Sequence, residues 1–406
     1  MPSDGATGLV SGDVRRHNLS LVLDHLVRVG PSARSEISDA TGLTRGSVTA
    51  LAQVLVEAGI LSQASPVGGS KGRPLTRLTL AADRIALLAV QLAADEVTAL
   101  LVTLAGEELY RASRPHGRPM GDPEPVLDAL GDVVRDAWGA AAAADRRIAD
   151  VTIVVLAPVG GRPPRVLGDI ALGWDEVDVI AGLLRRVPAL PPEIVRLESD
   201  IPLAATAELG ALKSTGDAVF IKGDSNVGGA LVVRGRVVRG AHGLAGSMGH
   251  LPVVPDGRPC ACGQHGCLVT IAGIDALLDA AGDDPRPMHE SPSAALEGFV
   301  ARVLAGDDRA VAAWEGAVAW IARALQIIAA ASDPRVVVIG GHWAALTTSI
   351  ADAFQANRPL IAGPGSAFAT SVLAGVLGAD AGLRGAVEAA RDRLLADPAT
   401  LIKFNA

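Results

Sequence analysis

The sequence predicts a mixed α/β protein in which a small helical head precedes a larger body. Apolar residues recur at helical spacing near the start, whereas strands and helices alternate after residue 82. The chain has 406 residues, of which 49% are hydrophobic and 20% are charged, enough to bury cores in two or three domains. We therefore expect a domain boundary near residue 80.

The charge is distributed unevenly between these two parts. The formal net charge is −8, yet residues 1–80 hold eight Lys and Arg against six Asp and Glu, which leaves +2 on the head and −10 on the rest. The sign of this difference suits a small head that binds nucleic acid and is attached to an acidic body.

The head has the pattern of a helix-turn-helix. Apolar residues at helical spacing over residues 18–29 predict a first helix, which Gly30-Pro31 ends. We expect Ser32 to cap a short second helix, Gly42 to form the turn and Thr44 to cap a third helix. The predicted inner face of that third helix is Val48, Leu51, Val54 and Leu55.

In a helix-turn-helix, the outward residues at the start of the second helix of the pair enter the major groove of DNA. Arg45 is the candidate for reading a base, because a bidentate contact between Arg and guanine is the commonest specific contact. Holding a phosphate is an equal alternative for Arg45. The predicted DNA-binding residues of this helix are Thr44, Arg45, Ser47, Thr49 and Gln53.

Two short strands follow, over residues 60–62 and 75–80, and a glycine-rich loop over residues 68–74 joins them. Because it follows three helices in the sequence, this arrangement predicts the wing of a winged helix-turn-helix. Glycines allow the loop to approach DNA closely, and Lys71 and Arg73 supply charge of the kind that enters a narrow minor groove. The alternative is a solvated linker with two incidental charges.

All three cysteines lie between Cys260 and Cys267, and Gly249-His250 precedes them by ten residues. Three cysteines cannot pair internally, and their crowding favours a metal site over buried thiols. Three thiolates and one imidazole form a closed tetrahedral set, for which structural zinc is the first choice. His265 competes with His250 as the fourth ligand, although Cys262, His265 and Cys267 would all have to turn inward within six residues.

The body has the alternating pattern of an α/β fold. The strand at residues 195–200 delivers Asp200 to a loop before an Ala-rich helix, and a glycine-rich turn occupies residues 223–229. The other predicted elements are strands at residues 85–92, 97–104, 150–156, 220–221, 230–233 and 336–339, and a helix around residues 125–144.

The chain does not open with a basic and then apolar leader, and its most apolar stretch, residues 324–341, is interrupted by Ser332-Asp333-Pro334-Arg335. These observations predict neither a secretion signal nor a membrane span. We expect a cytoplasmic protein that does not associate with membranes.

From about residue 15 to residue 396, the chain resembles transcriptional regulators of the ROK family (repressor, open reading frame, kinase). The winged head with Gly72-Arg73-Pro74, the segment from Gly240 to His250 and the Cys-x-Cys-Gly-x-x-Gly-Cys sequence carry the resemblance. Residues 382–386, Gly-Leu-Arg-Gly-Ala, are also similar to the closing helix of the family.

This resemblance implies a two-lobed body of the actin-like, ribonuclease-H-like (ROK) type, with a sugar cleft between the lobes. We expect the winged helix-turn-helix at residues 1–80, the first lobe at 81–197 and the second lobe at 198–406. The resemblance further implies a homodimer or homotetramer on double-stranded operator DNA. Its implied zinc ligands are His250, Cys260, Cys262 and Cys267.

The chain departs from the ROK kinases at both phosphate-binding segments. Those kinases open with an Asp-x-Gly-x-Thr loop, where this chain has Gln-Leu-Ala-Ala-Asp at residues 91–95. That stretch lacks the glycines that admit a phosphate, and Asp95 would repel one. The second phosphate turn carries Asp224 and Asn226 where glycine is usual. We therefore expect neither ATP use nor enzymatic activity.

The positions that contact sugar in the family are also altered. The family's Asn-Asp pair is Ser199-Asp200 in this chain, and Asp200, the equivalent of the kinase general base, is assigned only a hydrogen bond to a ligand. Ser247 and Val269 replace two glutamates, and the loss of these hydroxyl partners weighs against ordinary hexose binding. His250 can bridge the metal and the cleft. The predicted ligand-binding residues are Ser199, Asp200, Ser247, His250 and Val269.

The sequence therefore predicts a DNA-binding transcriptional regulator, a repressor that responds to a sugar or another small-molecule effector in the cleft. One alternative is a sugar kinase with an appended DNA-binding head. A second alternative is a metal-responsive switch in which zinc itself is the signal, which a closed coordination set disfavours.

Overall fold

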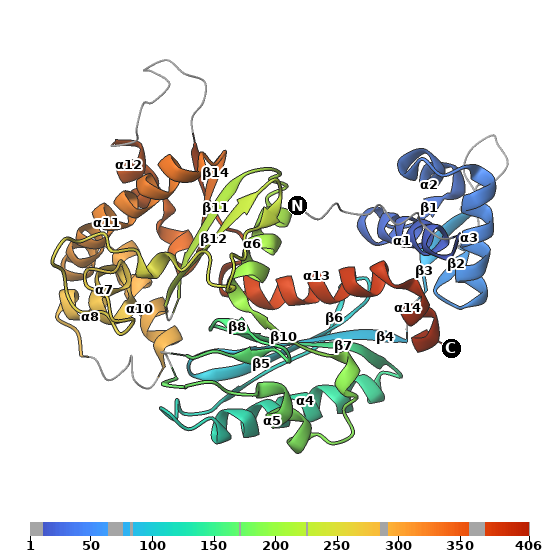
Figure 1. Ribbon diagram of the computed structural model, residues 1–406, viewed down its shortest axis with the longest axis horizontal. Coiled ribbons are helices and arrows are strands. Elements are labelled where there is room, and N and C mark those ends of the chain that lie inside the picture. The colour runs from blue at the N-terminus through green and yellow to red at the C-terminus, as the bar shows by residue number, and fades with distance from the viewer. Residues whose placement is uncertain are drawn as a thin grey trace, which may run out of the picture.

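The computed structural model describes residues 11–63, 76–81, 84–169, 172–224, 226–284, 291–356 and 370–405. It shows a small head beside a body of two lobes (Figure 1). The part of the predicted wing that contains Lys71 and Arg73 lies outside the described residues.

The head has the predicted winged helix-turn-helix fold. Its helices are α1 (Ser11–Val29), α2 (Arg34–Thr41) and α3 (Arg45–Glu57). Its small antiparallel sheet has the order β1 (Ser32–Ala33), β3 (Arg77–Leu80), β2 (Leu61–Gln63). Gly42 ends α2 in the left-handed conformation with φ of 72°, and Thr44 Oγ1 accepts a hydrogen bond from the Ser47 amide at 3.2 Å at the start of α3.

The start of α2 differs from the sequence prediction. Ser32 does not cap the helix, because its backbone lies in β1 and pairs with Leu78 of β3, and its hydroxyl donates to the Gly30 carbonyl at 3.0 Å. Ala33 precedes the helix instead, and its amide donates to the Glu36 carboxylate at 2.8 Å. The tertiary strand pairing therefore moved the helix start by one residue.

The first lobe is built on a five-stranded sheet. The strand order is β10 (Val195–Ser199), β7 (Arg147–Val155), β4 (Ile85–Leu92), β5 (Glu96–Thr103), β6 (Glu108–Pro115). The central strand β4 pairs antiparallel with β5 and parallel with β7. Helices α4 (Glu124–Ala143) and α5 (Val179–Arg186) cover one face of the sheet (Figure 1).

The second lobe repeats this strand topology. Its order is β13 (Arg236–Val237), β12 (Val227–Val233), β11 (Ala218–Gly223), β14 (Val336–Gly341), β15 (Ser371–Ala374). The first strand in sequence is again central, antiparallel to the second and parallel to the fourth. This repeat is the two-lobed, actin-like arrangement that the resemblance implied. The helices of the lobe are α6 (Asp200–Ala211), α7 (Val269–Ala272), α8 (Ile274–Ala281), α10 (Pro292–Leu304), α11 (Asp308–Ser332) and α12 (Thr347–Ala356).

Helix α11 is, among the described residues, the one helix long and apolar enough to cross a membrane. Half of its most apolar window is buried inside the protein. Trp314, Ile321 and Leu325 of this helix belong to the hydrophobic core of the second lobe. The composition of α11 is therefore that of a core helix.

The last two helices return to the first lobe and reach the head. Helix α13 (Ala381–Ala396) packs on the face of the first sheet opposite α4, and α14 (Pro398–Asn405) follows it beside α1 (Figure 1). One continuous hydrophobic cluster contains Leu23 of α1, Leu87 of β4 and Leu394 of α13. Arg28 of α1 also lies 3.8 Å from the Asp392 carboxylate. The head therefore shares a core with the body.

Candidate functional site

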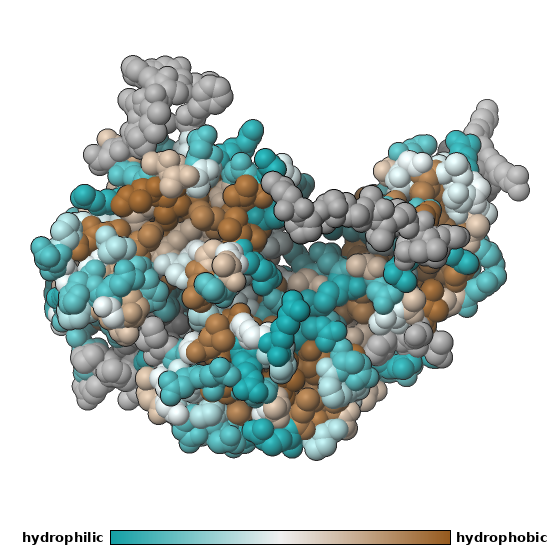
Figure 2. All heavy atoms as spheres, viewed as in Figure 1, coloured by the Kyte–Doolittle hydropathy of each residue, from teal (hydrophilic) through white to brown (hydrophobic). Residues whose placement is uncertain are grey.

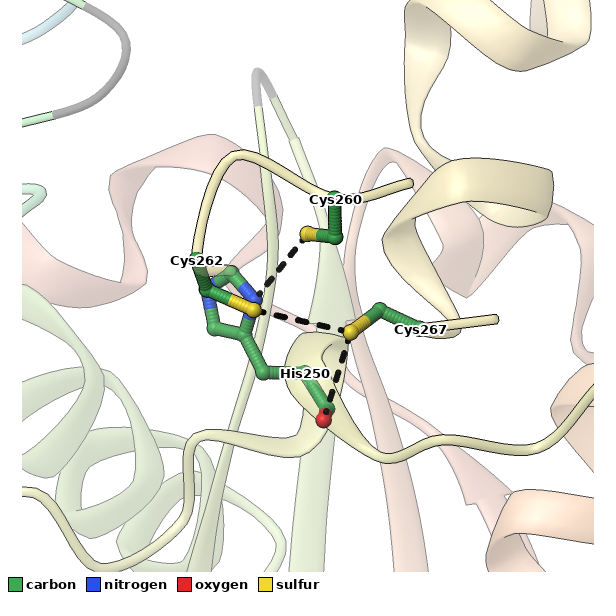
Figure 3. A group of neighbouring side chains, drawn as sticks. All are labelled: His250, Cys260, Cys262 and Cys267. Carbon is green, nitrogen blue, oxygen red and sulfur yellow. Dashed lines mark hydrogen bonds between the residues drawn. The ribbon is translucent and has the colours of Figure 1, made fainter. Parts of the chain in front are cut away.

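The predicted metal ligands meet in the second lobe (Figure 3). The ligand atoms of His250, Cys260, Cys262 and Cys267 all lie within 4.8 Å of one another. Cys262 Sγ lies 3.6 Å from Cys267 Sγ, and Cys260 Sγ lies 3.6 Å from His250 Nδ1. Ligands bound tetrahedrally at about 2.0–2.3 Å are separated by roughly 3.5–3.8 Å. The four side chains therefore fit a four-coordinate metal ion.

The local backbone explains how one short loop supplies three sulfur ligands. Isolated β-bridges join Pro252 to Cys267 and Pro259 to His265, which folds the loop back on itself. Gly266 has φ of 70°, and a side chain there would overlap the Val254 carbonyl. Glycine is therefore required at the turn that directs Cys267 inward.

The surroundings of the ligands fit metal binding. His265 is exposed and does not belong to the cluster, so the structure brings His250 and not His265 to the sulfur atoms. Burial lowers the pKa of His250, which favours the neutral imidazole that binds metals. Burial raises the pKa of the Cys267 thiol to about 12, so a metal must displace its proton.

A cavity of about 390 Å³ lies between the two lobes. Leu156 to Pro158 of the first lobe and Asn226 to Ala230 of the second lobe line opposite sides. The predicted ligand-binding residues Ser199, Asp200, Ser247 and His250 all line this cleft. Val269 does not line it, and lies instead with His250 and Cys260 along a neighbouring cavity of about 450 Å³.

A buried network of charges forms the floor of the cleft. Lys222 Nζ lies 2.5 Å from Asp200 Oδ2 and 2.5 Å from Asp224 Oδ2. His342 Nδ1 lies 2.9 Å from Asp224 Oδ1. The side chains of Lys222 and Asp200 are only 3% and 1% exposed. Asp200, the side chain that the resemblance matches to the kinase general base, is thus held in an internal ion pair.

Burial and the charges in this network compete to set the direction of each pKa shift. Burial lowers the pKa of Lys222, but the charges of Asp200 and Asp224 outweigh burial and raise it overall. Burial opposes ionisation of Asp224, yet Lys222 and the hydrogen bond from His342 hold its pKa well below the usual range. Burial raises the pKa of Asp200 overall, although the charge of Lys222 opposes this shift, and the nearby charge of Asp224 adds to the rise.

The two serines in the cleft use their hydroxyl protons internally. Ser199 donates to the Ala157 carbonyl at 2.9 Å, and Ser247 donates to the Leu244 carbonyl at 2.7 Å. Asn226 Oδ1 accepts a hydrogen bond from the Val227 amide at 2.8 Å. Several polar groups that face the cleft are therefore already paired with other groups of the chain.

Sequence reasoning named Asp200 and Asp224 but missed Lys222 and His342. A signal for Lys222 was present, because it interrupts an otherwise apolar strand directly after Phe220 and Ile221. A lysine in a buried strand needs a partner of opposite charge. No comparable signal marked His342, which follows β14 far along the chain.

The predicted DNA-binding residues of α3 lie on or near its exposed face. Thr44 and Ser47 hydroxyls lie 2.9 Å apart, and Thr49 Oγ1 donates to the Arg45 carbonyl at 2.8 Å. Gln53 Nε2 donates to Glu57 at 2.9 Å. The exposed Arg45 side chain forms no ion pair with any residue that the structure describes.

Two sugar kinases are similar to this chain in sequence over about half of its length. N-acetylmannosamine kinase from Citrobacter koseri is 34% identical over 195 residues, 46% of this chain and 62% of that protein. Glucokinase from Halalkalibacterium halodurans is 27% identical over 229 residues, 53% of this chain and 68% of that protein. The chain thus spans less than two thirds of the length of the first of these relatives.

Solved structures match over longer stretches. A ROK family transcriptional regulator, described as a homologue of the E. coli MLC protein, has a TM-score of 0.74 at 22% identity over 97% of this chain and 99% of that one. A ROK family glucokinase from Streptomyces griseus, in complex with glucose and AMPPNP, has a TM-score of 0.60 at 26% identity over 75% of this chain and 99% of that one. The family model described as ROK family matches residues 87–393, more than half of the chain, and the protein therefore belongs to the ROK family.

Proposed function

We propose that the protein is a DNA-binding transcriptional regulator, a repressor, whose interlobe cleft binds a small-molecule effector without phosphorylating it. The winged head carries this proposal, because its α3 presents Arg45 on an exposed face without an ion-pair partner among the described residues. Thr44, Ser47, Thr49 and Gln53 lie on the same helix, and we assign Lys71 and Arg73 to the same DNA interface. The structural likeness to a regulator across the head and body supports the fold that this function needs.

Communication between the cleft and the head is the second part of the proposal. We divide the chain into a head at residues 1–80 and lobes at 81–197 and 198–406, with α13 as the connection between them. Gly382 at the start of α13 packs against the Asp200 carboxylate, and Asp392 near its end lies 3.8 Å from Arg28 of the head. An effector that favours one lobe arrangement would shift the position of the heads through this helix.

We further propose that the cluster of three cysteines and His250 binds structural zinc in a cytoplasmic protein. A closed set of thiolate and imidazole ligands has no open position for catalysis, and reduced cysteines are typical of the cytoplasm. Zinc as the signal itself would require DNA affinity to change on partial chelation while the fold stays intact. Unchanged affinity would exclude that role.

The protein is proposed to act as a homodimer or homotetramer, because paired heads match the two half-sites of an operator. Figure 2 shows apolar side chains gathered on the second lobe in the region of α11 and β14. The second lobe also exposes Ile327, Leu373 and Val376. Exposed apolar surface of this kind is typical of contacts between subunits.

The principal test is a gel-shift assay with the DNA upstream of the protein's own gene. We expect sequence-specific retardation, and Arg45→Ala should weaken it by roughly 1–3 kcal/mol, or about 5- to 150-fold. Arg185→Ala is the matched control, because Arg185 is an exposed arginine on α5 of the first lobe, outside the surface proposed for subunit contacts. An absence of specific retardation at low salt would contradict the proposal.

A sugar kinase is the second candidate, and the identity to N-acetylmannosamine kinase favours it. The ion pair of Asp200 with Lys222 and the absence of glycines in residues 91–95 oppose it. A coupled assay for ADP release with ATP and either glucose or N-acetylmannosamine separates the two. We expect no turnover, whereas ADP release abolished by Asp200→Asn would establish the kinase.

A further inference from the structure

We infer that Lys222 determines which ligands the cleft accepts, because its ammonium group occupies the Asp200 carboxylate and keeps ligand hydroxyl groups from using it. The inference deepens the proposed function and rests on it for the cleft being an effector site. It makes Lys222 a specificity-determining residue.

The sheet of the second lobe positions Lys222 for this role. Its neighbour on β12 is Gly228 and its neighbour on β14 is Gly340, so neither adjacent strand places a side chain beside it. The lysine therefore has space to extend from β11 towards the start of α6. There its Nζ lies 2.5 Å from both Asp200 Oδ2 and Asp224 Oδ2, beneath the cleft.

The other oxygen of Asp200 is also closed off. Gly382 of α13 packs against Asp200 Oδ1, and any side chain at position 382 would overlap that oxygen. With Oδ2 on Lys222, Oδ1 against α13 and the side chain 1% exposed, the carboxylate presents almost no free surface to a ligand.

A ligand hydroxyl could reach Asp200 only by displacing the ammonium group. Separating a buried ion pair costs more free energy than a single hydroxyl hydrogen bond returns, because the lysine would keep its charge without water or a full set of partners. Ser199 and Ser247 add to this selectivity, since both spend their hydroxyl protons on main-chain carbonyls. The cleft floor therefore discriminates against ligands that are recognised by donating hydroxyl groups to Asp200.

The test uses the full-length protein and glucose as the probe, with binding followed by isothermal titration calorimetry. The double variant Lys222→Ala, Asp224→Asn removes one positive and one negative charge, so the net charge of the floor is preserved, and the shorter side chain at position 222 opens space beside Asp200 Oδ2. We expect its affinity for glucose to exceed that of the wild type by about tenfold or more, the value of a hydrogen bond to a charged group. Adding Asp200→Asn to this double variant should abolish the gain.

Two results would overturn the inference. One is a folded double variant whose affinity for glucose does not rise, or rises by an amount that Asp200→Asn does not remove. The other is a wild-type protein that loses about tenfold in glucose affinity on Asp200→Asn alone, because that carboxylate would then be available despite Lys222. If circular dichroism shows that the double variant does not fold, the comparison of the wild type with Asp200→Asn tests the inference.

Gel shifts on the same preparations separate this inference from the proposed function. If the wild type shows no specific DNA binding but the double variant gains affinity for glucose, the proposed regulator is rejected and the role of Lys222 stands. Retained DNA binding without the gain would reject the role of Lys222 alone.

Discussion

The cysteine cluster and the floor of the cleft are both compact polar sites in the second lobe, but they are assembled differently. The cluster draws its ligands from one short segment, between His250 and Cys267. The floor combines Asp200, Lys222 and His342, which are far apart in the sequence. The cluster needs an external cation to neutralise its thiolates, whereas the floor supplies its own cation as Lys222.

This difference determines how each site responds to the loss of one member. Without one ligand, the cluster is expected to lose its metal, and the loop then depends on main-chain contacts such as the isolated bridges that join Pro252 to Cys267 and Pro259 to His265. Without Lys222, Asp200 is left as a buried carboxylate without a cation, whereas Asp224 keeps its hydrogen bond with His342. The following predictions test this contrast, beginning with the largest effect.

Replacing Cys262 by Ser should remove the bound metal and destabilise the fold together. We expect the midpoint of thermal unfolding to fall by roughly 8 °C, as for a loss of about 4 kcal/mol in a large chain. Metal content and the midpoint are measured on the same sample. His265→Ala is the matched control and should retain both, because His265 lies in the same loop but outside the cluster. A Cys262→Ser protein with full metal content and an unchanged midpoint would show that the ligand set is wrong.

Replacing Lys222 by Met should destabilise the protein without affecting its metal content. The expected cost is roughly 3 kcal/mol in urea unfolding, the lower end of the range for removing one partner of a buried ion pair, because Asp224 keeps its hydrogen bond with His342. The double variant Lys222→Met, Asp224→Asn should recover part of this loss. If the double variant were the less stable of the two, the account of the floor as a charge-balanced network would fail.

The smallest effect concerns pH. Burial opposes ionisation of Asp224, but Lys222 outweighs burial and holds the pKa of Asp224 well below the usual range. Asp224 therefore contributes stability above the unfolded carboxyl pKa of about 3.9. That contribution is lost as the pH falls from there through the folded pKa. The stability difference between the wild type and Asp224→Asn should therefore be largest above about pH 4 and should shrink in more acidic solution. Urea unfolding at a series of pH values measures it, and a difference that grows on acidification would contradict a lowered pKa of Asp224 in the folded protein.

Several parts of the structure followed from sequence patterns alone. The central strand β4 lies at residues 85–92 as predicted, and Gly42 and Thr44 form the predicted turn and cap of the head. The edge strand β6, over Glu108–Pro115, was not predicted, because its charged and exposed residues lack the apolar alternation of a buried strand. Ser32 was predicted to cap α2 but lies in β1, because it pairs with Leu78, which is far along the chain.

The sequence by itself determined the class of fold and the three sulfur ligands of the cluster, because both are encoded in local spacing: helical or strand periodicity in the one, and closely spaced cysteines in the other. The choice of His250 over His265 came from the structure. Only the tertiary structure decided that Lys222 neutralises Asp200 and that α13 reaches from the cleft to the head. Contacts between distant segments depend on how the sheets and helices pack, and a charge reveals its partner only when that packing buries both.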